Sequence, residues 1–227
     1  MLRLRQVVVA ASDLRATRTA IEDSLGLPHV WADPGVSHFG LQNALYLIGD
    51  AFLEVVSPTK SDAPAQRFLD RAGHDAGYMA IVQTTDDLDD VRKRAEDQSI
   101  RVVFTAEGDG VTGLHFHPAD TEATLLSVDR CDVDAAWPWG GPAWEAAPDR
   151  GYRGITRAAF AVADPTAVAA RWAALLGTDA DGPSISVDGS TLDFVPLGDG
   201  LTGLCEVDLA GPANRNVSIA GVTFSVS

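Results

Sequence analysis

One local pattern occurs three times along this chain of 227 residues. Each copy is a short apolar run that ends at polar residues and leads into a stretch with the spacing of an amphipathic helix. The copies begin at Gln6, Met79 and Arg157, about 75 residues apart. A repeat of this length is typical of a supersecondary unit that packs against its neighbours. The chain is therefore expected to contain three related modules.

Each module reads as a strand, a helix and then further strands. Ser12, Thr85 and Asp164 are the candidate caps of the three helices, because their side chains can accept hydrogen bonds from free amide groups at a helix start. The strand patterns that follow cover 36–41, 44–48 and 52–57, then 102–105, 113–117 and 123–128, and finally 185–187, 191–196, 203–209 and 221–226. These patterns predict an α+β fold of repeated β-α-β-β-β modules.

The predicted modules divide the chain into three parts. Residues 1–130 hold two paired modules, and residues 151–227 hold the third. Between them, residues 131–150 are rich in Trp, Pro, Gly and Ala and are interpreted as a connector. Its tryptophans are expected to pack the connector onto a domain rather than to bind a ligand.

The charge of the chain limits its partners. A formal net charge of −15, from 32 acidic and 17 basic residues, repels phosphate backbones and anionic lipids, so neither nucleic acid nor a membrane surface is expected as a partner. An anionic ligand would need a local basic group. Two cysteines are too few for a zinc cluster or a disulfide framework, and no leader or bilayer-spanning run is visible, so a cytoplasmic location is expected.

Three motifs resemble the vicinal oxygen chelate superfamily, which contains glyoxalases, bleomycin-resistance proteins and extradiol dioxygenases. Residues 4–14 resemble the opening strand and helix start, and residues 49–58 (GDAFLEVVSP) resemble the closing strand of a first module. Residues 113–129 (GLHFHPADTEATLLSVD) are similar to the closing hairpin of a second module, above all in the epimerase branch. The resemblance implies paired modules whose sheet curves around a cup, with the third module as a further half.

In metal-using members of this superfamily, each module supplies one ligand from its first strand and one from its last. The matching positions here are Gln6 and Glu54 in the first module, Met79 (Ala80 in the alternative register) and Ser127 in the second, and Arg157 and Glu206 in the third. Met, Ala and neutral Ser are poor ligands for a hard divalent ion. The resemblance therefore predicts no bound metal, with a divalent ion left as the alternative.

Glu54 and His115 are the candidate catalytic residues. Glu54 alternates with Leu53 and Val55, so its carboxylate should face the cup and act as a general base or ligand anchor, or else simply bond to Gln6. His115 shares a strand face with His117, and each is either aimed into the cup or structural, with His117 capping the turn that follows.

Two functions remain open. In the first, a small organic molecule binds in the cup without a metal; in the second, a lyase, isomerase or epimerase uses Glu54 with His115. The expected ligand-binding residues are Gln6, Val8, His38, Phe52, Met79, Ile81, Leu125 and Ser127. An iron dioxygenase is disfavoured because both first-strand positions lack His. A homodimer is compatible with either function.

Overall fold

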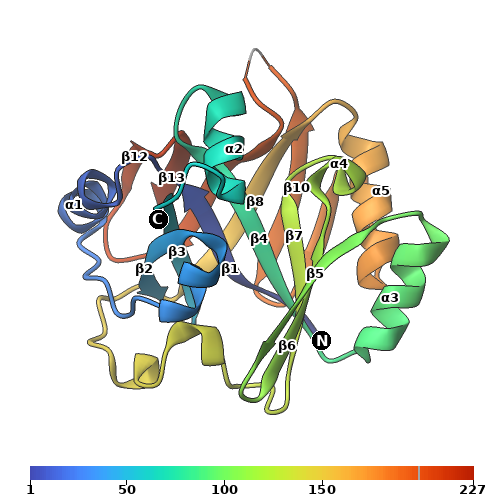
Figure 1. Ribbon diagram of the computed structural model, residues 1–227, viewed down its shortest axis with the longest axis horizontal. Coiled ribbons are helices and arrows are strands. Elements are labelled where there is room, and N and C mark those ends of the chain that lie inside the picture. Colours follow the sequence, from blue (N-terminus) through green and yellow to red (C-terminus); the bar gives the residue numbers. More distant parts are fainter. Residues whose placement is uncertain (199) are drawn as a thin grey trace.

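The computed structural model describes residues 1–198 and 200–227, which form two curved mixed sheets (Figure 1). The first sheet has seven strands in the order β2-β3-β1-β4-β7-β6-β5. Its strands are β1 (Leu2–Ala10), β2 (Leu41–Ile48), β3 (Ala51–Pro58), β4 (Ala76–Thr84), β5 (Val102–Gly108), β6 (Val111–Phe116) and β7 (Leu125–Cys131). β1 and β4, the opening strands of the two modules, pair antiparallel at its centre, and each has the closing strand of its own module, β3 or β7, parallel on its other side. The predicted α+β fold with cupped mixed sheets is confirmed.

The helices of the first sheet are α1 (Leu14–Leu25), α2 (Pro64–Ala72), α3 (Leu88–Asp97) and the single turn α4 (Pro118–Thr121). Two predicted caps are wrong by one or two residues. Asp13 caps α1 and Asp87 caps α3, in place of Ser12 and Thr85. Ser12 instead donates its backbone N–H and its hydroxyl to Asp75, which lies just before β4. The cap is thus chosen by which side chain the tertiary fold leaves free.

Two further segments differ from the sequence prediction. Residues 36–41 were expected to form a strand, but Pro34–Phe39 is a 3-10 helix, η1. Asp33 caps it, and Gly40 closes it in the left-handed conformation with φ of 68°, which residues other than glycine adopt at a cost. Helix α2 was not predicted; its buried residues Ala65 and Leu69 pack it beside β3 and β4.

The second sheet has six strands in the order β12-β13-β11-β8-β10-β9. Its elements are β8 (Gly154–Val162), α5 (Pro165–Leu176), β9 (Ser184–Val187), β10 (Ser190–Pro196), β11 (Gly203–Ala210), β12 (Arg215–Ile219) and β13 (Val222–Val226). Asp164 caps α5 as predicted. Every pairing in this sheet repeats a pairing of the first sheet in the same direction, with β8, β9 and β10 in the places of β1, β2 and β3.

This second sheet therefore contains more than the predicted third module. β11 pairs antiparallel with β8, as β4 pairs with β1, so it opens a fourth unit rather than closing the third. β13 lies parallel to β11 and β12 antiparallel to β13, which matches β7 and β6. The fourth unit has no counterpart of α3 among the described residues, because β11 passes to β12 through residues 211–214.

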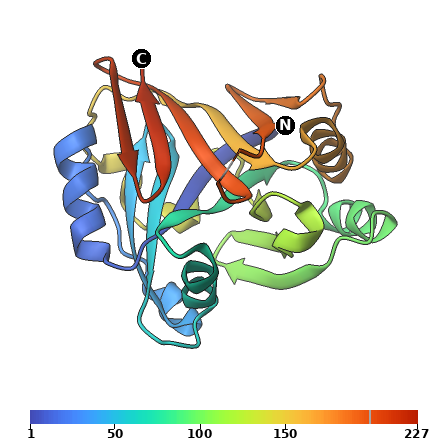
Figure 2. The ribbon, with the colours of Figure 1, turned by 90° about the horizontal axis from the view of Figure 1, so that it is seen from above.

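The main core lies between the inner faces of the two sheets, and the buried sides of α1, α3 and α5 form part of it. Its largest side chains come from both sheets and from α5, where Trp172 contacts Phe160 and Phe194 at ring-centroid distances of 5.1 and 5.2 Å. α3 and α5 lie side by side, and α1 packs beside β12 (Figures 1 and 2). This packing leaves the outer, concave face of the first sheet available for a site.

The connector lies against that concave face. It contains two short 3-10 helices, η2 (Pro138–Gly140) and η3 (Trp144–Ala146), and Trp137 is completely buried. Trp137 and Trp144 lie over the guanidinium of the buried Arg5, at 5.0 and 5.8 Å from the ring centroids. These two tryptophans therefore pack the connector onto the first sheet, while the third connector tryptophan, Trp139, lines the cavity described below.

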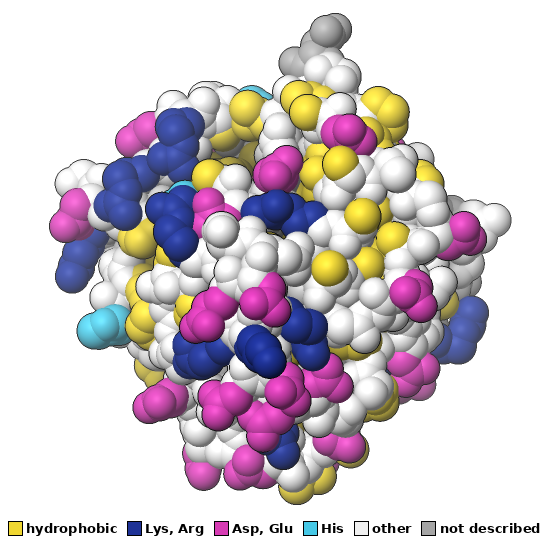
Figure 3. Space-filling model, turned by 90° about the vertical axis from the view of Figure 1, so that its right-hand side faces the viewer, with side chains coloured by type: hydrophobic (Ala, Val, Ile, Leu, Met, Phe, Trp, Pro, Cys, Tyr) yellow, Lys and Arg dark blue, Asp and Glu magenta, His cyan; other side chains and the backbone are white. Residues whose placement is uncertain are grey.

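The described surface is mixed in charge. On the face of α3 and α5, Asp and Glu side chains are interspersed with Lys and Arg (Figure 3). Among the described helices, none combines the length and the apolar character that a bilayer crossing requires.

Candidate functional site

A cavity of about 1320 Å³ lies on the concave side of the first sheet. Its floor comes from β1, β3, β4 and β7, and its walls come from η1, α2, β5 and β6. Eight of the sequence-predicted residues line it: Gln6, Val8, His38, Glu54, Met79, Ile81, His115 and Leu125. Phe52 and Ser127 do not line the cavity and are completely buried; Phe52 is in edge contact with Trp144, and the hydroxyl of Ser127 donates to Asp129.

Glu54 is the buried carboxyl group of the first module. Its side chain points away from Leu53 and Val55, and the residue is 8% exposed. Gln6 Nε2 donates to Glu54 Oε2 at 2.7 Å, and Asn43 Nδ2 donates to Glu54 Oε1 at 2.6 Å. Burial raises the pKa of Glu54 to about 7, against these two hydrogen bonds, which favour the carboxylate. A carboxyl group with this pKa can both accept and release a proton near neutral pH.

The orientation of Gln6 is set from the connector. Trp137 Nε1 donates to Gln6 Oε1 at 3.1 Å, so the other end of the amide is turned toward Glu54. Asn43 is held in the same way, because its Oδ1 accepts the backbone N–H of Asp33 at 2.9 Å. Both donors to Glu54 are therefore fixed by a second hydrogen bond.

Asp129 is a second buried carboxyl group in the cavity, which the sequence reasoning did not select. It is 1% exposed and accepts hydrogen bonds from the hydroxyl of Ser127 and, at 2.7 Å, from Trp139 Nε1. Burial raises its pKa to about 6. Strand alternation could have found it, because Asp129 falls on the same face of β7 as Leu125 and Ser127.

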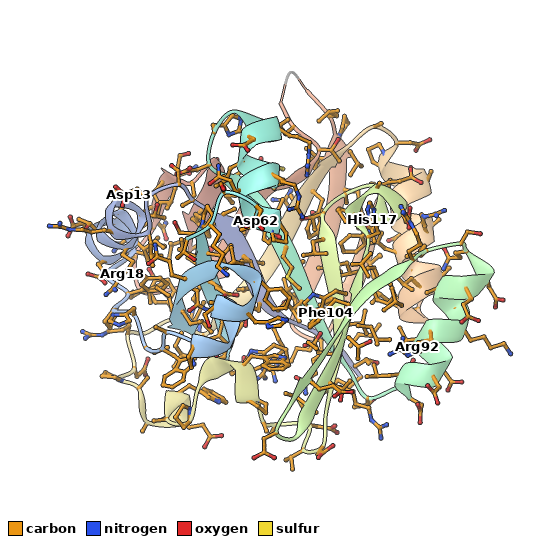
Figure 4. The ribbon with its side chains drawn as sticks, in the orientation of Figure 1. Asp13, Arg18, Asp62, Arg92, Phe104 and His117 are labelled. Atoms are coloured by element: carbon orange, nitrogen blue, oxygen red, sulfur yellow. The ribbon has the colours of Figure 1, made fainter. Side chains whose placement is uncertain are left out.

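His115 and an aromatic contact close one side of the cavity. Phe104 of β5, which is labelled in Figure 4, meets Phe39 of η1 edge-on with ring centroids 5.0 Å apart, and it meets His115 at 5.5 Å. Burial lowers the pKa of His115 to about 4, so its imidazole is neutral at pH 7. His38 contacts Phe39 at the rim. His117 caps α4 by accepting the backbone N–H of Ala119 at 3.1 Å, as the structural alternative predicted.

The residues at the superfamily's metal positions do not fit a divalent ion. The oxygen of Gln6 is occupied by Trp137, and its amide nitrogen faces Glu54, so the pair is arranged as donor and acceptor rather than as two ligands. The second module offers the thioether of Met79, which lines the cavity, while Ser127 donates to Asp129. Within the described residues, no three His, Cys, Asp or Glu side chains are grouped to hold a metal.

The metal positions of the third module differ from those of the first two modules. Arg157 forms an ion pair with Glu206 at 2.8 Å. The residue that corresponds to Glu54, however, is Asp193, because β10 rather than β11 is the strand parallel to β8. Arg157 forms an ion pair with Asp193 as well, so this position of the second sheet holds a carboxylate that is already neutralised.

Comparison with known proteins agrees with the architecture. The model of the glyoxalase-like domain family matches residues 7–176, and the chain belongs to this family within the vicinal oxygen chelate superfamily. A search of curated proteins found no match.

Several solved structures share the fold. A methylmalonyl-CoA epimerase in complex with methylmalonyl-CoA and NH4+ is 20% identical, with a TM-score of 0.52, over 59% of this chain and 97% of that one. A single-substitution variant of the Streptomyces coelicolor methylmalonyl-CoA epimerase, in complex with 2-nitronate-propionyl-CoA, is 19% identical with a TM-score of 0.52, over 60% and 98%. The Mycobacterium tuberculosis epimerase is 22% identical with a TM-score of 0.50, over 64% and 92%.

Proposed function

We propose that the protein binds a small organic molecule in the cup of the first sheet and moves a proton on it, as an isomerase or epimerase, with Glu54 as the acid–base group. The observation that carries this proposal is the state of Glu54. It is buried, its pKa is near 7, and it is held by two neutral amides rather than by a cation. A purely structural carboxylate would be expected to have a cationic partner, because a buried charge is costly without one.

The chemistry of the site suits abstraction of a proton next to a carbonyl group. The carboxylate form of Glu54 removes the proton, and its acid form returns it. Asp129, with a pKa of about 6, is a second group of the same kind on the other module. The neutral imidazole of His115 can donate a hydrogen bond to a substrate oxygen without adding charge. The epimerases with the same fold give this class of reaction as the first one to test.

The test is the exchange of substrate C–H for solvent deuterium. Methylmalonyl-CoA and a panel of 2-substituted acyl thioesters and 2-hydroxy ketones are incubated with the protein in D2O and followed by mass spectrometry. Wild type should exchange one proton in at least one compound. Glu54→Gln should lower the rate by a factor on the order of 10²–10⁴, the range for loss of a general base. Glu96→Gln, an exposed carboxylate of α3, is the matched control.

A second function, ligand binding without catalysis, is favoured by one observation. Both oxygens of Glu54 are already occupied by amide donors, as they would be in a rigid binding wall. In that case the compounds that raise the thermal midpoint of wild type would show no exchange. Glu54→Gln would then weaken binding of such a ligand by roughly 1.5–3 kcal/mol if the charge anchors it. Exchange by wild type that persists in Glu54→Gln would refute the assignment of Glu54 as the base.

A further inference from the structure

Helix α2 forms one wall of the cavity and brings the only described Lys or Arg side chains to its lining. The residues of α2 that face the cavity are Pro64, Arg67, Phe68, Arg71 and Ala72, which occupy one side of the helix. Arg67 and Arg71 are one turn apart and therefore neighbours on that side. Ala65 and Leu69, on the opposite side of the helix, are buried and anchor it to the sheet. Two guanidinium groups are thus presented together at the mouth of the cavity.

Neither guanidinium forms an ion pair with a described carboxylate. The guanidinium of Arg67 donates to the backbone carbonyl of Asp62, which lies just before the helix. Some arginines of other elements do form ion pairs: Arg101 binds Asp120 at 2.7 Å, and Arg94 binds Asp86 at 2.9 Å. In a chain with a net charge of −15, acidic partners are abundant, so two neighbouring arginines without one leave positive charge available to a ligand.

The wall continues from these arginines into the cavity. Phe68 and Tyr78 are in edge contact, with ring centroids 5.1 Å apart. Both guanidinium charges act on Tyr78, where they oppose the burial that raises its pKa to about 12. The lining also includes Met79 and Leu125, which are paired neighbours on β4 and β7. The surface therefore runs from cationic to aromatic to aliphatic.

We propose that the ligand of the cup is an organic anion, a carboxylate or a phosphate ester, whose charged group binds Arg67 and Arg71. Its apolar part lies along Phe68, Met79 and Leu125 toward Glu54. The placement of the ligand's apolar part toward Glu54 rests on the proposed function. The recognition of the anion by α2 does not. The arginines overcome the repulsion that an acidic protein exerts on an anion, and their fork of donors suits both oxyanions.

Calorimetry with matched eight-carbon probes tests this. The probes are octanoate, octyl phosphate and the neutral octanamide, at low ionic strength and in 0.5 M NaCl. Wild type is compared with Arg67→Gln/Arg71→Gln and with Arg15→Gln/Lys93→Gln, which removes the same charge from exposed positions of α1 and α3. Met79 reports on the location, because the chain has only two methionines and a labelled methyl group of Met79 lies in the cavity wall.

At least one anion should bind wild type about tenfold or more tightly than octanamide, and 0.5 M salt should reduce that difference. The difference should vanish in the Arg67/Arg71 variant and persist in the control. Comparison of the two anions tells whether the wall selects a carboxylate or a phosphate. Equal binding of octanamide, an anion preference that survives in the Arg67/Arg71 variant, or binding that leaves the Met79 methyl signal unmoved would each overturn the proposal.

The failure of this proposal is distinguishable from failure of the proposed function. Glu54→Gln should keep the preference for the anion, because the arginines are untouched. Exchange without anion preference would leave Glu54 as the base and refute α2 as the anion site. Anion preference without exchange would support α2 as the anion site and refute Glu54 as the base. Circular dichroism of each variant checks that it is folded.

Discussion

Trp137 and Gln6 are joined by a hydrogen bond of 3.1 Å although 131 residues separate them in the chain. The indole N–H can only donate, so the group it meets on Gln6 must be the amide oxygen. That choice turns the amide nitrogen of Gln6 toward Glu54. The connector thus controls the hydrogen bonding of a carboxyl group to which it is not itself bonded.

Trp137→Phe should raise the pKa of Glu54 above its value of about 7. The indole N–H is lost, Gln6 is free to turn its oxygen toward Glu54, and the carboxylate loses a donor while burial persists. The pKa is measured by carbon NMR of labelled glutamate side chains. Trp139→Phe is the matched control, because Trp139 donates to Asp129 instead. An unchanged or lower pKa of Glu54 in Trp137→Phe would show that Gln6 is held without the indole.

The stability of the protein should fall as pH rises from about 4.5 to about 7. The pKa of Glu54 is 4.5 when unfolded and about 7 when folded, so across this window the folded state binds more protons than the unfolded state. The shift corresponds to a contribution of at most about 3 kcal/mol to the free energy of unfolding. This contribution is fully present below pH 4.5 and is lost by pH 8. Urea unfolding at pH 5 and pH 8 measures it.

Asp129 contributes to the same slope in the same direction, because its pKa is also raised. His115 acts in the opposite direction, because its pKa is lowered to about 4 and the unfolded state binds the extra proton up to about pH 6.5. Glu54→Gln should therefore remove most of the fall in the free energy of unfolding between pH 5 and pH 8. A fall of the same size in this variant would mean that Glu54 has an ordinary pKa in the folded protein.

Asp129→Asn should lower any proton exchange that the protein catalyses while keeping the fold. The amide retains an oxygen to accept from Trp139 but can neither take up nor release a proton. A loss on the order of 10²-fold is expected if Asp129 takes part in proton transfer. Thermal unfolding is the control for structure. Full activity in a folded Asp129→Asn protein would leave Glu54 as the sole acid–base group.

Gly77→Ala should destabilise the contact between the two sheets. A Cβ at Gly77 of β4 would lie 2.2 Å from the backbone oxygen of Leu204 on β11, and neither backbone can move without disturbing its sheet. A loss of about 1–3 kcal/mol or more in the free energy of unfolding is expected. Gly198→Ala, where an added Cβ meets nothing within 4 Å, is the control. Equal stability of the two variants would show that the sheets separate easily.

Local patterns were sufficient to predict the modules and the inward direction of several side chains. Alternation along a strand places Gln6 and Val8 on one face of β1 and Glu54 on the matching face of β3, whatever surrounds them. Helix α5 and its cap Asp164 were also found, because the apolar spacing of this helix and a capping side chain directly before it are both local features of the sequence. Helix α2 was missed although Ala65, Phe68, Leu69 and Ala72 recur at helical spacing, because it is short and lies outside the repeated module pattern.

The sequence by itself determined the repeated α+β modules, the acidic net charge and the placement of Glu54 opposite its apolar neighbours, because these depend on the composition and the spacing of residue types along the chain. Only the tertiary structure decided that the connector orients Gln6, that Asp129 is buried in the same cavity, and that β11 pairs as the start of a fourth unit. These relationships join residues far apart in the chain. They depend on which strand edges and donors the folded sheets bring together, and no local pattern encodes that choice.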